Sequence, residues 1–453
     1  MSWFTNIFSA GKHKKTSDKR EAETVGLVPK VVEYHTCSAP VSEEVDKLLY
    51  QKIQHFIPIR YLEEQQITFL GHKILTYTDQ SVIYIYGQAA DYVYYLLEGE
   101  VTLQPNAQHS YTLSADALRA HFPINSGQLF GATAVANGTV KILAIASDLT
   151  KLWTARSKGE LSCVELMDLN LPDELNNSRF FQSFSEAFRE NKLLLPTLPD
   201  VAYKLREAMQ NDIGVPEAVD IIQIDSTIVT KLIQVVNSPF YAPVTPITNC
   251  QDAVTRLGLV ATRNLVMSIS LKQLFSCQDK NLSKLMHRLW QRSLYISSLS
   301  FVLAEETGVI NPDDALLAGL VCDIGVIPLL HFAEKFPEQY PDMAELEVAI
   351  PHLRGPIGTL VLHTLGFGET LTAIPHHSED WHYDSGDTVS LVDIVMLAKL
   401  HSYFGSKQAG RLPYINSIPA YAKLKDNQLT PEFSLSVLQK AKQRIGDAMR
   451  VLE

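Results

Sequence analysis

The sequence predicts a multidomain α+β protein, in which a small antiparallel β-roll is followed by an all-α helical domain. Three observations lead to this prediction. At 453 residues the chain is longer than a single hydrophobic core usually organises. Residues 57–155 carry short runs rich in Val, Ile and Tyr, broken by glycine, which are typical of strands. From residue 196 onward apolar residues recur three and four apart, which indicates amphipathic helices.

These patterns divide the chain into five predicted segments. A polar, lysine-containing start is expected to be a flexible tail, and a charged stretch between the two halves is expected to be a connecting helix. The predicted segments are a tail at 1–40, the β-roll with flanking helices at 41–165, the connector helix at 166–190, the helical domain at 191–405 and a C-terminal helical extension at 406–453.

The β half is predicted from three runs, "SVIYIYG" (81–87), "DYVYYLLEGEVTLQ" (91–104) and "LFGATAVANGTVKILAI" (129–145). Asn137 and Gly138 form a dipeptide that favours a tight turn, so we expect a turn there. A helix is expected just before the roll, at 42–56, where Val, Leu and Ile recur at helical spacing.

The helical half opens after Pro196 and Pro199. Helical patterns are predicted in "VPEAVDIIQIDSTIVTKLIQVVNS" and again at 252–276, 283–306, 312–334, 356–376, 388–404 and 431–452. Gly355 and Pro356 are expected to interrupt a helix, because proline inside a helix removes a hydrogen bond and clashes with the preceding turn.

Composition narrows the classes of function. A net charge of −11 argues against broad nucleic-acid binding, which depends on phosphate neutralisation by Lys and Arg. The five cysteines are scattered without a C-x-x-C pair, which favours reduced thiols in a cytoplasm and gives no zinc motif. We expect no transmembrane segment and no cofactor, and a cytoplasmic location.

One acid lies in the apolar run "LLAGLVCDIGVIPLL" (316–330). Asp323 follows Cys322 there, and a buried carboxylate without a partner costs several kcal/mol. We therefore expect Asp323 to have a cationic partner, either a metal ion or a basic side chain.

Four stretches of the helical half, the last of which contains Asp323, carry a family resemblance: "LPTLPDVAYKLREAM" (195–209), "IIQIDSTIVTKLIQVVNSPFY" (221–241), "AVTRLGLVATRNLV" (253–266) and "LAGLVCDIGVIPLL" (317–330). In this order they resemble the HDOD family, whose members are helical output domains of bacterial signalling proteins related to HD phosphohydrolases. The resemblance covers about 190–405. It implies a helical fold without assigning chemistry to it.

The resemblance also implies where a metal site would lie in an active HD enzyme. Three of its ligand positions match Arg292, Arg354 and Lys399 here, and the His of the His-Asp doublet matches Cys322. Guanidinium groups cannot release a proton to bind a cation, and fixed positive charges repel a divalent ion.

The remnant positions of that pattern are Asp323 and the pair His376-His377, with His352 and His363 as conceivable additions. For the histidine pair, a polar helix end or a solvated pair is the alternative to a metal site. We therefore expect no metal and no catalytic residue, and we expect Asp323 to pair with Arg292 or Arg354.

The β half, from "IYIYGQAADYVYYLLEGEVTLQ" (83–104) to "GQLFGATAVANGTVKILA" (127–144), resembles a cyclic nucleotide-binding domain. The resemblance places a phosphate cassette after Phe130, with Gly131, Ala132 and Lys141 as its ligand-binding positions. Ala132 stands where nucleotide-binding members have an acid, and Lys141 where they have an Arg, so the planar fork that pairs with a cyclic phosphate is missing.

Taken together, the sequence predicts a non-catalytic bacterial signalling protein. Its β-roll would act as a sensor or docking domain, and its helical domain as an output that contacts unidentified signalling proteins, with a homodimer possible. Two alternatives stay open: a metal-dependent phosphohydrolase acting on a nucleotide or cyclic dinucleotide, and a true cAMP or cGMP receptor that binds the nucleotide at the roll.

Overall fold

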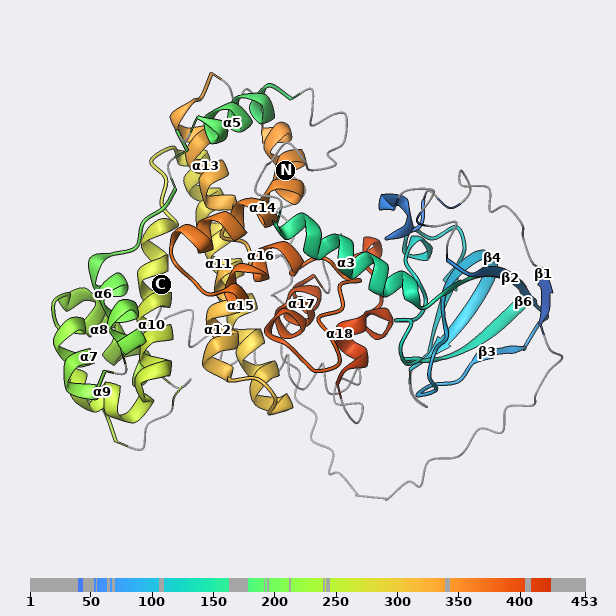
Figure 1. The fold of residues 1–453 in the computed structure, drawn as a ribbon, viewed down its shortest axis with the longest axis horizontal. Coiled ribbons are helices and arrows are strands. Elements are labelled where there is room, and N and C mark those ends of the chain that lie inside the picture. Colours follow the sequence, from blue (N-terminus) through green and yellow to red (C-terminus); the bar gives the residue numbers. More distant parts are fainter. Residues whose placement is uncertain are drawn as a thin grey trace, which may run out of the picture. The chain divides into compact units, whose positions relative to one another are not determined.

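The computed structural model describes residues 40–43, 53, 55–62, 66, 70–105, 110–162, 178–190, 192–193, 195–211, 213–238, 241, 245–338, 343–403 and 409–424. The chain forms two compact units, which are described separately below (Figure 1). Unit 1 contains residues 1–153 and 403–422, and unit 2 contains residues 154–402 and 423–453. Residues 1–39 of the predicted tail and the predicted helix at 431–452 lie outside the described residues.

Unit 1 is built on a sheet that has six strands within the described ranges. The strands are β1 (Val41–Glu43), β2 (His72–Tyr77), β3 (Val82–Tyr84), β4 (Tyr92–Gln104), β5 (Tyr111–Ser114) and β6 (Thr133–Ala146). Their order is β1-β2-β6-β4-β5, β3 also pairs with β6, and every one of these pairs is antiparallel. The β-roll predicted from the Val, Ile and Tyr runs is therefore confirmed.

The two long strands bend instead of ending. Asn137 and Gly138 lie inside β6, so the turn expected there is wrong. Gly99 on β4 and Gly138 both have positive φ, 91° and 75°, and the β4–β6 register shifts between Leu96 and Glu100. A Cβ atom on Gly99 would lie 2.5 Å from the Thr139 carbonyl oxygen. Glycine thus permits a bulge that bends the paired strands without breaking them.

The sheet buries both of its faces. Val140, Ile142 and Ala144 of β6 belong to the core inside the roll, whereas Leu143 and Ile145 belong to a second core. This alternation follows from the two-residue period of a strand. Phe56, Leu62 and Leu149 also contribute to the second core, so residues on both sides of the strands in sequence cover that face.

Short helices and one long helix accompany the sheet. The short ones in unit 1 include η1 (Ile59–Tyr61) and η2 (Leu118–His121), and the long one is α3 (Asp148–Ser162). The unit boundary falls inside α3, between Trp153 and Thr154, rather than at the predicted 165. Residues 41–43 form β1, so the predicted helix does not begin at 42; residues 44–52 lie outside the described residues.

A late segment of the chain returns to unit 1. Residues 403–422 belong to this unit, and within them lie η6 (Ala409–Arg411), η7 (Ile415–Ser417) and α18 (Pro419–Ala422). Within the C-terminal helical extension predicted at 406–453, residues 409–422 thus form short helices that group with the roll. Pro413 and Pro419 limit the length of these helices because proline cannot donate a backbone hydrogen bond.

Unit 2 is helical throughout the described residues. Its longer helices are α5 (Arg179–Arg189), α6 (Asp200–Ala208), α7 (Val215–Ile222), α8 (Ser226–Val236), α9 (Cys250–Leu257), α10 (Leu259–Leu271), α11 (Lys280–Thr307), α12 (Pro312–Val321), α13 (Val326–Lys335), α14 (Met343–Thr364) and α17 (Leu391–Ser402). Two short helices, α15 (Glu369–Thr372) and α16 (Ile374–His377), lie between α14 and α17 (Figure 1).

The helix expected to connect the two halves is part of the helical core instead. Phe180 and Phe184 of α5 are fully buried, and both rings contact Phe332 of α13 at centroid distances of 5.7 and 5.3 Å. Ser178 caps the helix by accepting a hydrogen bond from the Phe181 amide. Helix α5 also carries charged residues, but its apolar residues lie on one side of the helix, and that side packs into the core.

The stretch around Asp323 is the most apolar part of unit 2. The helical span Pro312–Lys335 is long and apolar enough to cross a membrane by composition, and 94% of its most apolar window is buried inside the protein. Burial to this degree is what a core helix in a helical bundle shows.

Helix α14 passes through both of its prolines, so the predicted break at Gly355-Pro356 is wrong. The two glycines that flank Pro356 let another helix approach closely. A Cβ atom on Gly355 would lie 3.2 Å from the Cα of His376, and one on Gly358 would lie 2.4 Å from Pro375. Packing of α16 against this part of α14 offsets the roughly 3 kcal/mol that an internal proline costs.

Candidate functional site

Asp323 lies in the turn between α12 and α13 and is 1% exposed. Its Oδ1 atom accepts hydrogen bonds from Lys399 Nζ at 2.6 Å and from Arg354 Nη1 at 3.0 Å. The Nε atom of Arg292 lies 3.7 Å from Asp323 Oδ2. The expected pairing of Asp323 with an arginine is confirmed, and a third cation, Lys399, lies closest of all.

A second carboxylate completes the cluster. Glu379 follows α16 and faces the same three cations: its Oε1 lies 3.1 Å from Lys399 Nζ and 3.5 Å from Arg292 Nη2, and its Oε2 pairs with Arg354 Nη2. We call these five residues, Arg292, Asp323, Arg354, Glu379 and Lys399, the charge cluster. Three positive and two negative charges give it a net charge of +1.

The charge cluster is built from three helices and two turns. Arg292 comes from α11, Arg354 from α14 and Lys399 from α17. Lys399 is fully buried and also donates to the hydroxyl of Ser378 at 3.0 Å. Buried charges are tolerated only when each has partners, and here every member has at least two.

Electrostatics keep both acids ionised. Burial alone would raise the pKa of Asp323, but Lys399, Arg292 and Arg354 together hold it well below its usual range. Burial likewise opposes ionisation of Glu379, and Arg354, Lys399 and Arg292 lower its pKa to about 2. Both carboxylates are therefore charged at neutral pH and neutralise the basic side chains around them.

These residues do not fit a divalent metal ion. Lys399 and Arg354 already occupy Asp323 Oδ1 with N–H donors, and neither can offer a lone pair. Burial raises the pKa of the Cys322 thiol to about 12, with Asp323 adding to the effect, so Cys322 is not a thiolate ligand at neutral pH. Among the described residues, no three His, Cys, Asp or Glu side chains gather as a possible metal site.

The histidine pair has a different environment from the one expected. His377 is fully buried, and its ring stacks on Tyr383 with centroids 3.7 Å apart. Its Nδ1 atom lies 3.2 Å from the hydroxyl of Ser157, which donates to Asp380 at 2.6 Å. His377 is thus no solvated residue but part of the packing between the C-terminal half of α3 and the segment after α16. Burial, with help from His377, lowers the pKa of His376 to about 4.

In the β-roll, the structure separates the predicted ligand-binding positions. Ala132 is 1% exposed and belongs to the core inside the roll. Lys141 alternates with Val140 and Ile142, which face that core, so Lys141 lies on the other side of the sheet. There its Nζ pairs with Glu98 at 2.9 Å, with both side chains largely exposed.

Gly131 contacts the returning segment of the chain. Its carbonyl accepts a hydrogen bond from Asn416 Nδ2 at 3.1 Å, and a Cβ atom at Gly131 would lie 2.2 Å from the Asn416 carbonyl oxygen. Tyr111 donates to Asn416 Oδ1 at 2.8 Å, and its ring packs on Tyr414 with centroids 4.1 Å apart. Residues 414–417 therefore cover the start of the predicted cassette.

Arg119 also contacts the returning segment. Arg119 lies 4.2 Å from the centre of the Tyr414 ring, and its Nε donates to the Leu412 carbonyl at 2.8 Å. Its Nη2 donates to the Ala409 carbonyl. These contacts could not be predicted from the sequence, because the partners are about 290 residues apart and the segment has no periodic pattern of its own.

Comparison with known proteins finds a family model that matches part of the helical half. The family model "HDOD domain" matches residues 195–352. A protein of Treponema pallidum described as uncharacterized is 26% identical over 159 residues, which is 34% of this chain and 29% of that protein. The match thus spans less than a third of the length of this curated relative.

Two solved structures illustrate what the chain is similar to. One from Shewanella amazonensis, named provisionally as a metal-dependent phosphohydrolase, has 25% identity and a TM-score of 0.48, and covers 60% of this chain and 98% of its own. Another, from Ruegeria pomeroyi, is named provisionally as a cyclic nucleotide binding protein; it has 15% identity and a TM-score of 0.19, and covers 30% of this chain and 67% of its own.

Proposed function

Because the chain contains an HDOD domain over residues 195–352, we propose that it is a non-catalytic regulatory protein whose helical unit acts by contacting other signalling proteins. The β-roll serves as its sensor or docking module, in the cytoplasm. The charge cluster takes the place of the metal centre of an HD enzyme and holds the helices together.

The observation that carries this proposal is the hydrogen bond from Lys399 Nζ to Asp323 Oδ1. In a metal-dependent hydrolase, the retained Asp would supply a lone pair to the ion that polarises a phosphoryl oxygen. Here the same oxygen accepts from an ammonium group and a guanidinium group, and the cluster already has a net positive charge. A divalent cation would have to displace both donors and then stand beside three fixed positive charges.

The contacts of the roll support a protein-contacting role over nucleotide binding. The position expected for the ribose-binding acid is the buried Ala132, and Lys141 pairs with Glu98 on the opposite side of the sheet. Neither Ala132 nor Lys141 would thus offer a cyclic phosphate a fork-shaped donor. Regulation would then work as a shift of population between two arrangements of the protein, biased by whatever contacts the roll.

The test of the non-catalytic role compares the natural protein with a variant carrying a rebuilt ligand set. Full-length protein purified without chelator is analysed for metal content and assayed with a generic phosphodiester and a cyclic dinucleotide in the presence of Mn²⁺. The variant R292H/C322H/R354H/K399D restores the residue types that the HD pattern uses. We expect less than a tenth of an equivalent of bound transition metal and no turnover in the natural protein, with metal uptake only in the variant.

The opposite result would be equally clear. Stoichiometric Mn, Fe or Ni in the natural protein, or hydrolysis of either phosphodiester that Lys399→Ala abolishes, would establish a hydrolase and end the proposal. Calorimetric titration with cAMP and cGMP examines the roll separately: micromolar binding that is lost in Lys141→Ala would show a nucleotide receptor.

A further inference from the structure

Unit 2 contains a cavity that lies apart from the charge cluster. It has a volume of about 270 Å³ and is lined by residues of α6, α10, α12, α15 and the turn between α14 and α15. This is close to the lower end of the range for small-molecule sites, about 300–1,000 Å³. None of the residues that line it belongs to the charge cluster.

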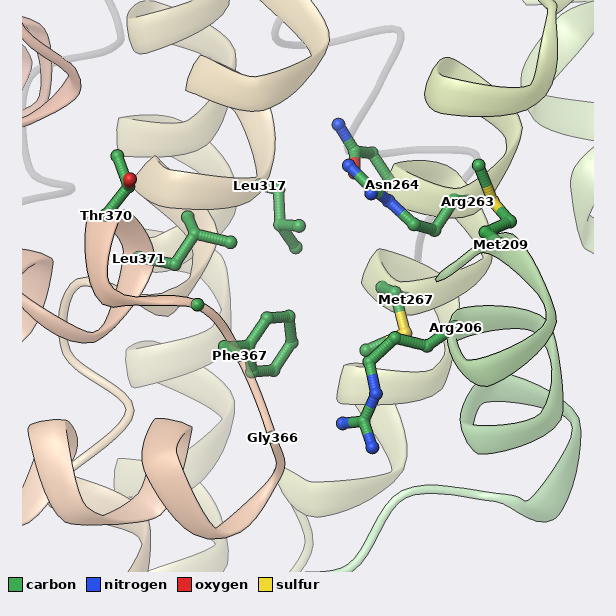
Figure 2. A pocket seen from close by; sticks show the side chains of 11 residues that line it. Arg206, Met209, Arg263, Asn264, Met267, Leu317, Gly366, Phe367, Thr370 and Leu371 are labelled. Atoms are coloured by element: carbon green, nitrogen blue, oxygen red, sulfur yellow. The ribbon is translucent and has the colours of Figure 1, made fainter. Parts of the chain in front are cut away.

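The two walls of the cavity differ in character, as Figure 2 shows. One wall carries Arg206 and Arg263, whose guanidinium groups lie at opposite ends of that wall, with the amide of Asn264 beside Arg263. The facing wall carries Phe367 and Leu371. A mostly apolar site with a few well-placed polar groups is the usual form of a small-ligand pocket.

Arg206 is positioned by the end of α14. Its Nη1 donates to the Leu365 carbonyl, one of the carbonyls left over at a helix C-terminus. Gly366 lets the guanidinium come this close, because a Cβ atom there would lie 2.4 Å from Arg206 Nη1. Among the described residues, no carboxylate forms an ion pair with Arg206, so its charge and its remaining N–H donors are available to a ligand.

Arg263 is held by a short polar network. Its Nε and Nη2 both donate to Asn264 Oδ1 at 3.1 Å, and Asn264 Nδ2 donates to Asp314 at 2.6 Å. Asp314 lies 3.9 Å from Arg263, and that arginine side chain is 35% exposed. The two arginines and this one acid leave a net charge of +1 at the cavity wall. The guanidinium is therefore oriented without being fully neutralised.

The turn "GFG" at 366–368 places the aromatic ring of the facing wall. The Gly366 amide donates to the His363 carbonyl and the Phe367 amide donates to the Leu362 carbonyl, which is the pattern of a Schellman helix end. Gly366 has φ of +73°, as that motif requires. Phe367 thus comes from a well-defined backbone turn and lines the cavity opposite the arginines (Figure 2).

We propose that this cavity binds a small organic anion, with its phosphate or carboxylate group at Arg263 and its flat apolar body against Phe367. Guanidinium groups bind both kinds of anion through paired N–H donors, and an aromatic ring packs well on a second ring. The site would exclude cations by charge. Ligand binding here would give the helical unit an input of its own, independent of the β-roll.

The experiment is isothermal titration of the full chain with probes that carry both parts or only one. The complete probes are nucleoside 5′-monophosphates, benzoate and indole-3-acetate, which separate phosphate from carboxylate heads. The half probes are adenosine and inorganic phosphate. We expect at least one complete probe to bind with a dissociation constant about tenfold or more below those of the half probes, which corresponds to about 1.4 kcal/mol.

Variants then assign the binding to the cavity. Arg263→Ala and Phe367→Ala should each weaken the best probe about tenfold or more, whereas Arg256→Ala, an exposed arginine of α9 outside the cavity, should leave it unchanged. Arg206→Ala also removes a helix-end contact, so Arg263→Ala is the deciding variant. No binding of any complete probe, affinity equal to that of inorganic phosphate, or unchanged affinity in Arg263→Ala would overturn the proposal.

Discussion

Lys399 donates a hydrogen bond to Asp323 across 2.6 Å, and both side chains are buried to at least 99%. The two residues come from α17 and from the turn between α12 and α13, so this one contact links elements 76 residues apart. Around it, Arg292, Arg354 and Glu379 form a closed set of ion pairs. Such a set makes each member costly to remove singly, because its partners stay behind buried and charged.

Asp323→Ala should therefore destabilise unit 2 strongly. The substitution strands Lys399 and Arg354, and breaking a buried pair on one side typically costs ~3–5 kcal/mol. Urea unfolding at pH 7 measures the change in the free energy of unfolding. Asp387→Ala, at an exposed acid of the same unit, is the matched control and should stay within about 0.5 kcal/mol. A loss below about 1 kcal/mol for Asp323→Ala would mean that the ion pairs contribute little.

Glu379 predicts a loss of stability in acid. Its pKa is about 2 in the folded protein against an ordinary value of 4.5, so its contribution is present above pH 4.5 and is lost as the pH falls towards 2. In Glu379→Gln, the free energy of unfolding should change less between pH 4.5 and 2, by on the order of 1–3 kcal/mol. Glu338→Gln, at an exposed glutamate, should leave the pH profile as in the natural protein. Identical profiles for Glu379→Gln and the natural protein would contradict the pairing.

His401 predicts a second, separate pH window. Burial lowers its pKa to about 4 from an ordinary value of 6.5, so the unfolded chain binds a proton between these values and the folded chain does not. Stability should fall as the pH drops from 6.5 to 4, and His401→Leu should reduce that fall by on the order of 2 kcal/mol. The exposed His363, replaced by Leu, serves as the reference. An unaltered slope in His401→Leu would rule out this source of acid sensitivity.

Gly131→Ala should loosen the returning segment from the β-roll. Its new Cβ atom would lie 2.2 Å from the Asn416 carbonyl oxygen, and forcing an extra methyl into packed structure costs typically ~1–3 kcal/mol. Hydrogen exchange of the amides at 409–418 should become faster, and thermal unfolding should begin earlier. At Gly71, a Cβ atom would lie 4.0 Å from its nearest neighbour, so Gly71→Ala should change neither readout. Unchanged exchange in Gly131→Ala would show that Asn416 is not held at this position.

The sequence foretold the charge cluster only in part. Arg292, Arg354 and Lys399 could be placed because they stand at motif positions, and the pairing of Asp323 followed from the cost of a bare buried acid. Glu379 could not be found in this way, because "HHSED" reads as an ordinary polar stretch. Its role exists only because α16 packs against the two glycines of α14 and brings the next residues to the cluster.

In the fold as well, features set by short segments could be predicted from the sequence, whereas features set by contacts between distant residues could not. Alternating and helical periods predicted the roll and the helices, since both are properties of short segments. Turn and helix-breaking propensities predicted a turn at Asn137-Gly138 and a helix break at Pro356. Both predictions were wrong, because pairing with neighbouring strands and packing against a neighbouring helix decide the structure at these positions. The contact of Gly131 with Asn416 joins residues 285 apart and carries no trace in either local sequence.

The return of residues 403–422 to the β-roll has a consequence for how the chain is made. A ribosome releases the strands early, yet the segment that packs beside Gly131 emerges only after residues 154–402 of the helical unit have been translated. A gene fragment ending near residue 165 would therefore yield a roll in which Gly131 is uncovered. A fragment that joins residues 403–422 to the roll through a short linker should give a complete domain that aggregates less.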